Sequence, residues 1–408
     1  MSQSTETPVA APVAAPTGRA AAVLLVLLGC LTAIGPLSLD MYLPAFPQMA
    51  ADLDAAQAQI QLSLTTCLIG MAAGQLVTGP LSDRWGRRRP VLIGISAYVL
   101  LALACAAAPS AELLAATRFA QGFAGGTGVV VARAVVRDLY AGRAAAKYFS
   151  RLTLVFGVVP VAAPSLGSLV LGFTSWRGVF LVIALIGLLL AVANALWLPE
   201  TLPAHRRSTG GLRAFGRTAR TLATDRVYLG FALTQGLAFA GLFAYISGSS
   251  FVFQDVFGLS STAFSVIFGL NAVAFVALGQ LNGRLVDRYE PRRLLVTALT
   301  VGAVTAVTLL GASLTGSVLL VALLLFVFMG SLGMVMPNGT ALALDRHPRT
   351  AGTAAALMGA IQSVVGSLAA PLVGLGGEGS AVPMAVVVCG AALLSLTAVL
   401  TLARERRT

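Results

Sequence analysis

The sequence predicts an all-α integral membrane protein with twelve transmembrane helices in two pseudo-symmetric halves of six. Three observations support this fold class. Hydrophobic residues make up 57% of the 408 residues and charged residues only 10%, whereas a soluble domain carries about a quarter charged residues. Twelve apolar segments are long enough to cross a bilayer. A charged loop of the first half also returns, in altered form, half a chain length later.

The twelve segments follow from length and hydropathy. A helix needs about 20 mostly apolar residues to cross the hydrocarbon, and the mean hydropathy of the chain is +0.89. Segments that meet this requirement are predicted over 20–43, 59–81, 90–108, 112–132, 152–173, 178–198, 227–249, 262–283, 294–313, 317–339, 351–375 and 381–403.

These segments divide the chain into halves joined by a linker. Residues 1–18 are rich in Ala, Pro, Ser and Thr, a composition typical of a disordered tail. The first apolar run has about spanning length and no basic start, so we expect it to be retained rather than cleaved as a signal. The predicted parts are a cytoplasmic tail over 1–18, a half over 19–198, a cytoplasmic linker over 199–226, a half over 227–403 and a basic tail over 404–408.

The repeated loop supports the doubling. It reads GPLSDRWGRRR from Gly79 to Arg89, and the second copy reads GRLVDRYEPRR from Gly283 to Arg293. The alignment matches the glycines, the leucines and the Asp-Arg pairs. A chain doubled in this way, with its charges confined to loops, is typical of transporters built from two related membrane halves.

The chain carries a net charge of +12, and its basic residues are distributed as a membrane topology requires. Most basic residues fall in alternate loops, and the other loops carry acidic residues with Arg177 as their only basic residue. The positive-inside rule then puts both termini in the cytoplasm. This placement argues against nucleic-acid binding. Because 26 arginines stand beside the single lysine Lys147, we expect a GC-rich bacterial source and hence the inner membrane of a bacterial cell.

Nothing in the sequence indicates an enzyme, a metal site or a bound cofactor. The four cysteines sit singly in apolar runs, which favours small core residues. Both histidines, His205 and His347, fall in loops, and no P-loop occurs. A channel or receptor is the remaining alternative from another class. Prolines inside the apolar segments favour alternating access over either.

Several strings resemble one family. The 79–90 loop resembles the signature that members of the major facilitator superfamily carry between helices 2 and 3. The string RFAQG from Arg118 to Gly122 is similar to the helix 4 motif of proton-coupled members. The run with Gly157, Pro160, Pro164 and Gly167 resembles the antiporter motif of helix 5, although Ala163 and Ser168 stand where the family favours glycine. This departure leaves symport open as an alternative to antiport.

The most specific string is LDMYLPAFP from Leu39 to Pro47. It is similar to the end of helix 1 in the bicyclomycin- and chloramphenicol-resistance branch of twelve-span drug:proton antiporters. The resemblance implies a monomeric multidrug exporter of small lipophilic or cationic antibiotics, driven by the proton motive force. Protons would be the coupling ion, and the drug, protons and lipid would be the partners. The alternative on the same fold is a carrier of one metabolite, such as an amino acid, a sugar or a purine.

Asp40 and Arg118 are the charges placed well inside apolar segments, and an ionisable group at depth is a functional candidate by default. Both fall toward the outer half of the membrane. The functional hypothesis is that Asp40 takes up a proton outside and releases it inside, while Arg118 favours its ionised form. The alternatives are that Asp40 caps a helix end with Arg118 reaching to it, or that Arg118 is a fixed structural partner.

The second half lacks these charges, since its matching positions are Ala244 and Ala322. We therefore expect coupling to reside in residues 20–200. The resemblance also implies a cytoplasmic gate in which Asp83 faces the start of a helix near Ala351 and Arg84 reaches Asp138. Alternatively, the arginines of this loop act as topology determinants. The predicted gate residues are Gly79, Asp83, Arg84, Gly86, Arg87, Arg88 and Asp138, with Asp287 and Arg288 as a weaker copy.

A pocket for apolar or cationic drugs needs aromatic residues and methionine with few hydrogen-bonding groups. Each candidate has the alternative of being a core or lipid-facing residue. The predicted pocket residues are Tyr42, Gln121, Phe243, Tyr245, Asn271, Met336, Asn338 and Gln362.

Overall fold

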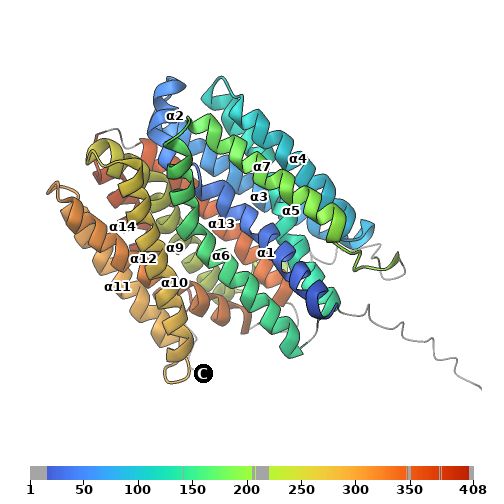
Figure 1. Ribbon diagram of the computed structural model, residues 1–408. Coiled ribbons are helices and arrows are strands. Elements are labelled where there is room, and N and C mark those ends of the chain that lie inside the picture. Colours follow the sequence, from blue (N-terminus) through green and yellow to red (C-terminus); the bar gives the residue numbers. More distant parts are fainter. Residues whose placement is uncertain are drawn as a thin grey trace, which may run out of the picture.

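The computed structural model describes residues 16–140, 142–204, 207, 220–345, 347, 351–375, 377 and 379–403, and the regular structure in them is helical (Figure 1). The predicted terminal tails lie almost wholly outside these residues. The first half contains α1 (Gly18–Asp40), a 3₁₀ turn (Leu43–Ala45), α2 (Phe46–Asp52), α3 (Gln57–Trp85), α4 (Arg88–Ala106), α5 (Ala111–Leu139), α6 (Gly142–Leu171) and α7 (Trp176–Trp197). The second contains α9 (Arg226–Phe251), a π-helical turn (Val252–Val256), α10 (Ser261–Leu285), α11 (Pro291–Ala312), α12 (Val318–Asp345), α13 (Ala351–Leu375) and α14 (Val382–Thr401).

The predicted fold class is confirmed. Eleven helices of the described chain are long and apolar enough to cross a membrane, and α6 adds the apolar segment Val158–Leu171. The predicted ends are less accurate. The segment predicted over 112–132 stops before Arg133, whereas α5 continues to Leu139, because a helix can leave the hydrocarbon without ending.

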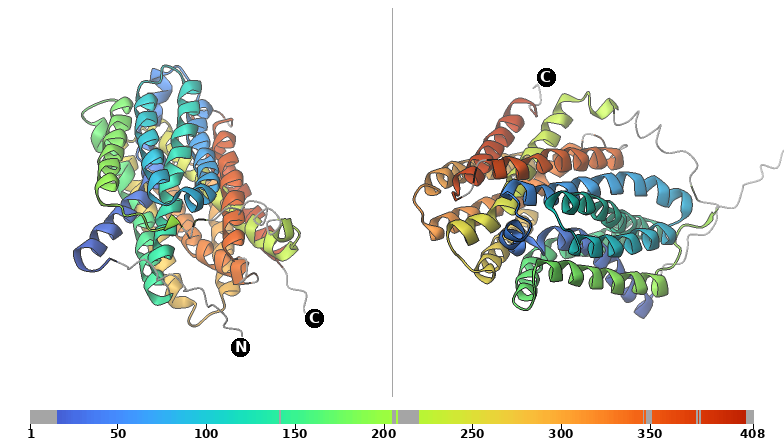
Figure 2. Two further views of the ribbon diagram at one scale, coloured as in Figure 1. Left: turned by 90° about the vertical axis from the view of Figure 1, so that its right-hand side faces the viewer. Right: turned by 90° about the horizontal axis from the view of Figure 1, so that it is seen from above.

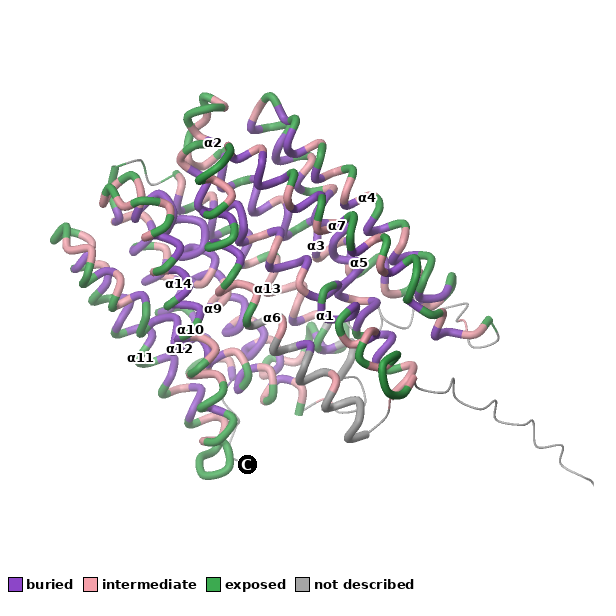
Figure 3. The backbone as a smooth tube through the Cα atoms, in the orientation of Figure 1, coloured by how far each residue is buried: buried purple, intermediate pink, exposed green. Residues whose placement is uncertain are grey.

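The long helices of the described chain run alternately up and down, and they pack as two neighbouring groups (Figures 1 and 2). The α3–α4 and α10–α11 connections lie at one end, which we call the basic face because it carries Arg84–Arg89 and Arg284–Arg293. The other end, where α2 lies, we call the opposite face. Buried residues lie inside each group and exposed residues lie on its outside (Figure 3). Many of the exposed residues are large and apolar.

Glycines bring α3 and α5 close together. A Cβ atom at Gly74 of α3 would overlap the Phe123 carbonyl, and one at Gly122 of α5 would overlap the Cys67 carbonyl. Small residues allow such close approach in membranes, where no hydrophobic force drives helices together. This contact therefore fixes the position of α5, which carries Arg118.

We expect Gly122→Ala to destabilise the protein by about 1–3 kcal/mol, because the added methyl group overlaps backbone that cannot rotate away. Gly283→Ala is the matched control. Gly283 also lies in a helix, but nothing stands within 4 Å of its added Cβ, so the change should be neutral or stabilising by up to about 1 kcal/mol. Thermal unfolding in detergent measures both, and equal unfolding temperatures would contradict the close packing.

The two halves meet near the opposite face. The Ser250 hydroxyl donates to the Leu43 carbonyl at 2.6 Å, and the Gln61 amide donates to the Ser247 carbonyl at 3.1 Å. Further hydrogen bonds of this kind join Gln254 to Pro44, Thr65 to Ser367, Ser168 to Ser261 and Thr262, and Ser265 to Pro164. We call these seven hydrogen bonds, which join described residues of the two halves, the interhalf contacts. Among the described residues, the interhalf contacts thus gather toward the opposite face.

Candidate functional site

Asp40 ends α1 at the interface between the halves. Pro44 and Pro47 follow closely, and proline disfavours helix at the residue before it, so the chain passes into the 3₁₀ turn. The Asp40 side chain is buried, with 4% of its surface exposed. Its carboxyl group makes no hydrogen bond or ion pair with any described residue. Its electrostatic neighbour is Tyr245 of α9, in the other half.

Tyr245 and Asn271 complete this part of the site. The Asn271 side-chain amide donates to the Tyr245 hydroxyl at 3.0 Å, and the Tyr245 ring stacks on Phe268 with centroids 5.4 Å apart. Both residues are buried. Tyr245, which lies within electrostatic range of Asp40, and its partner Asn271 were both predicted as pocket residues.

Arg118 lies inside the first half and is fully buried. Its guanidinium donates to the Gln121 side-chain oxygen and to the Ser38 carbonyl, both at 2.6 Å. It also lies over the Tyr42 ring, 4.4 Å from the centroid, which is cation–π geometry. Its Nε atom has no partner within the described chain. The Arg118 guanidinium is thus paired with a carbonyl at the end of α1 and with an aromatic face, and not with a carboxylate.

The structure does not bring Arg118 to Asp40, although the sequence suggested this pair. Positions 38 and 40 of a helix differ by about 200° around its axis. The Ser38 side lies within the first half, where the Ser38 hydroxyl contacts the Tyr98 hydroxyl at 2.5 Å. Asp40 instead lies near α9. The two charges therefore occupy different sides of the end of α1.

The other predicted pocket residues are spread over both halves. Gln121 and Tyr42 both contact the Arg118 guanidinium. The Tyr42 hydroxyl also contacts the Ser63 hydroxyl at 3.1 Å. Asn338 donates to the Asn282 side chain at 2.6 Å, within the second half. The remaining positions are a buried Phe243 packed on Phe239, Met336, whose carbonyl accepts from Gln235, and a half-buried Gln362. Of the eight predicted residues, Tyr245 lies within electrostatic range of Asp40, and Asn271 is hydrogen-bonded to Tyr245.

The helix with the predicted antiporter motif packs against the end of α1. A Cβ atom at Gly167 of α6 would overlap the Met41 carbonyl. Pro160 and Pro164 lie inside α6, and the Pro164 carbonyl accepts from Ser265 of the other half at 3.1 Å. Gly157 falls where only the helical backbone is described. Ser168, at a position where the resembling motif favours glycine, makes an interhalf contact.

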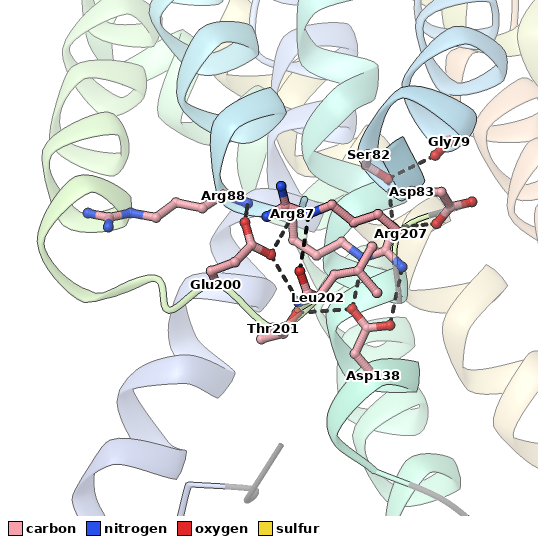
Figure 4. A network of polar contacts seen from close by, with 10 residues as sticks. All are labelled: Gly79, Ser82, Asp83, Arg87, Arg88, Asp138, Glu200, Thr201, Leu202 and Arg207. Atoms are coloured by element: carbon pink, nitrogen blue, oxygen red, sulfur yellow. Dashed lines mark hydrogen bonds and ion pairs between the residues drawn. The ribbon is translucent and has the colours of Figure 1, made fainter. Parts of the chain in front are cut away.

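A charged network occupies the basic face of the first half (Figure 4). The Arg87 guanidinium, with 6% of the side chain exposed, contacts Asp83 at 2.5 Å and Asp138 at 2.8 Å. It also donates to the Ser82 hydroxyl at 2.9 Å, and that hydroxyl donates to the Gly79 carbonyl. Gly86 has φ = 90°, a conformation that favours glycine. Arg87 therefore joins α3 to α5.

This geometry corrects the predicted contact of Arg84 with Asp138. Arg84 is exposed and has no hydrogen bond or ion pair within the part of the chain described. Because Gly86 turns the chain sharply, the residue after it, and not the last turn of α3, reaches α5. Arg88 donates to the Ala195 carbonyl. The predicted approach of Asp83 to the helix start near Ala351 involves residues 348–350, which lie outside the described chain.

The second copy of the loop forms no matching network. The side chains of Asp287 and Arg288 make no hydrogen bond or ion pair with other described residues. The fuller network thus belongs to the first half, as the better-preserved signature suggested.

Glu200 completes the network and was missed by sequence reasoning. Its carboxylate accepts from the backbone N–H of Arg87 at 2.8 Å and of Arg88 at 3.3 Å. The neighbouring Thr201 hydroxyl donates to Asp138 at 3.0 Å. An anion at the start of α4 suits the positive end of the helix dipole. An acidic residue shortly after a spanning helix, in a mostly basic linker, was the available signal.

Burial alone would lower the pKa of Arg87, but hydrogen bonds and charge interactions with Asp138 and Asp83 outweigh it, so the pKa lies above its ordinary value. A group whose folded pKa is raised contributes stability below its unfolded pKa, and loses it as pH rises through the folded value. For arginine, both values lie far above neutral pH. The network therefore keeps its positive charge throughout the physiological range.

We expect Arg87→Gln to destabilise the first half by about 3–5 kcal/mol, because it removes one partner of a largely buried ion pair. Arg84→Gln removes the same charge from an exposed, uncontacted position and should change stability by less than about 0.5 kcal/mol. Thermal unfolding of both purified variants measures the difference. A larger loss for Arg84→Gln would restore the predicted role of Arg84.

A family model described as Major Facilitator Superfamily matches residues 28–371. The chain is 40% identical to an uncharacterized MFS-type transporter, YdgK, of Bacillus subtilis, over 96% of this chain and 98% of the relative. It is 33% identical to a bicyclomycin resistance protein homolog of Haemophilus influenzae, over 88% and 90%. It is 30% identical to multidrug resistance protein D of Escherichia coli, over 86% and 88%.

Solved structures share the fold. A bacterial homolog of the human lysosomal transporter Spinster, in an inward-facing and unoccupied conformation, superposes with a TM-score of 0.74 over 95% of both chains. The sequences are 15% identical, so the likeness concerns the fold alone.

Proposed function

The chain belongs to the major facilitator superfamily, and from this premise we propose that it exports small lipophilic or cationic drugs in exchange for protons. Membership makes it a multi-pass membrane transport protein and not an enzyme. The drug class is supported by two relatives, at 33% and 30% identity, whose names carry bicyclomycin or multidrug resistance.

Asp40 is the observation that carries the proton coupling. Its carboxyl group is buried between the halves and has no hydrogen-bonding or ion-pair partner among the described residues. An unpaired charge at such depth is costly, so this group is the one best suited to exchange a proton. A cationic drug beside Tyr245 would be attracted to the ionised carboxylate and released when a proton arrives.

Alternating access gives this exchange a direction. The interhalf contacts hold the halves together near the opposite face, and the proposed cycle assigns this arrangement to the state that is open at the basic face. These contacts are neutral hydrogen bonds, each contributing about 0.5–1.5 kcal/mol, so the halves can separate there without breaking an ion pair. Separation would expose Asp40 to the opposite side for proton uptake and drug release. Closure and reopening at the basic face would complete the cycle.

The same proposal covers location and partners. The basic face lies in the cytoplasm of a bacterial cell by the positive-inside rule, and both termini lie there with it. The protein acts as a monomer in the inner membrane. Its partners are the drug, protons and lipid, without nucleic acid and without a bound cofactor.

Efflux from proteoliposomes tests the function. Vesicles are loaded with chloramphenicol or a fluorescent lipophilic cation, and release is followed with and without an imposed pH gradient. We expect saturable, gradient-dependent release that protein-free vesicles lack. Release of neither compound under any gradient would overturn the drug assignment and favour a carrier of one metabolite. Release unaffected by the gradient would overturn the proton coupling.

A further inference from the structure

A groove of about 480 Å³ lies on the outer surface of the first half, at the basic face. It is lined by Trp85, Arg89, Leu92 and Ile93. Trp85 is the last residue of α3, and the other three lie in the first two turns of α4. The groove thus begins at the charged loop and continues along a spanning helix.

The arginines of the loop differ in their surroundings, since two of them bind other parts of the protein and one lines this groove. Arg87 binds Asp83 and Asp138, and Arg88 binds the Ala195 carbonyl. Arg89 is exposed and makes no hydrogen bond or ion pair with any residue that the structure describes. The Trp85 indole, with 43% of the residue surface exposed, is likewise without a hydrogen-bonding partner in the described chain. Arg89 and Trp85 thus bring to the lining of the groove two hydrogen-bond donors that no described residue of the protein uses.

The far end of the groove is apolar. Ile93 has 61% of its surface exposed and lies four residues beyond Arg89, or about 6 Å along the helix axis. At that depth a spanning helix has entered the apolar part of the bilayer. An occupant must therefore present negative charge at Arg89 and hydrocarbon at Leu92 and Ile93. A free phosphate ion or an acidic soluble peptide meets only the first requirement.

We propose that this groove binds one anionic phospholipid of the leaflet at the basic face. The lipid phosphate accepts hydrogen bonds from the Arg89 guanidinium and the Trp85 indole N–H, and an acyl chain covers Leu92 and Ile93. Tryptophan and arginine at the headgroup level are suited to these contacts. The site is independent of what the protein transports.

Quenching of Trp85 fluorescence by brominated lipids tests the proposal. The full-length protein is placed in nanodiscs that contain brominated phosphatidylglycerol or brominated phosphatidylcholine, and the Trp85 signal is the difference between wild type and Trp85→Phe. We expect phosphatidylglycerol to be preferred at Trp85 by about five-fold, which is the effect of one arginine near a charged surface. Arg89→Gln should abolish the preference, Arg89→Lys should keep most of it, and Arg89→Glu should reverse it.

The repeat supplies a matched control. Arg293 and Tyr289 occupy the equivalent positions of the second half and are exposed, but Thr297 replaces Ile93. Arg293→Gln changes the net charge equally and should leave the Trp85 preference unchanged. An equal loss in Arg293→Gln and Arg89→Gln would overturn the site in favour of diffuse surface charge. Relief of quenching by inorganic phosphate, or by a soluble acidic peptide, would overturn the lipid as its occupant.

Discussion

Replacing Asp40 with Asn is expected to reduce proton-driven efflux to the level of protein-free vesicles. The substitution keeps the size of the side chain and removes the exchangeable proton. It breaks no hydrogen bond or ion pair of the described structure, so the fold should be retained. Drug binding and gradient-independent exchange of drug across the membrane should remain measurable, because the Tyr245 ring and the interhalf contacts are unchanged.

Asp54→Asn is the matched control for this experiment. Asp54 is exposed near the opposite face, and its φ of 47° is a conformation that asparagine tolerates. The control removes one carboxylate from the same side of the molecule and should leave coupled efflux intact. Coupled efflux that survives Asp40→Asn would eliminate Asp40 as the proton carrier while leaving the exporter assignment in place. Loss in both variants would point to surface charge instead.

The number and course of the spanning helices could be predicted because the bilayer sets a minimum apolar length that each segment must meet. Sequence also gave the depth of Asp40 and Arg118, since depth is counted in residues from a loop. It did not give the direction in which each side chain points. In the structure the Arg118 guanidinium donates to the Ser38 carbonyl, whereas Asp40 makes no contact with Arg118 and lies within electrostatic range of Tyr245. The predicted Asp40–Arg118 pair was argued from equal depth, and depth does not tell on which side of the helix a side chain lies.

The basic loop illustrates a second limit. Arg84 and Arg87 are equivalent by composition, and the positive φ of Gly86 determines which of them reaches Asp138. Glu200 is more than a hundred residues from Arg87 in sequence, and no local pattern joins them. Contacts between distant segments that depend on one backbone dihedral angle cannot be predicted from the sequence.

Linking the halves at the opposite face is expected to stop transport completely and reversibly. The Ser168 and Ser261 hydroxyls lie 3.3 Å apart across the interface, so cysteines at these positions can come close enough for a disulfide after a small adjustment. In a Cys30→Ser background, which removes the exposed native thiol, oxidation of Ser168→Cys/Ser261→Cys should abolish gradient-driven efflux. Reduction should restore it, because the opposite face can then open again.

A disulfide within one half provides the control for this experiment. The Thr78 and Thr127 hydroxyls lie 3.0 Å apart between α3 and α5, both in the first half. Oxidised Thr78→Cys/Thr127→Cys should continue to transport, since each half moves as a unit when the interhalf contacts break. Mass spectrometry of the oxidised peptides verifies that each bond has formed. Full efflux with the Ser168–Ser261 bond in place would mean that the contacts at the opposite face do not separate during the cycle, and alternating access at this interface would have to be abandoned.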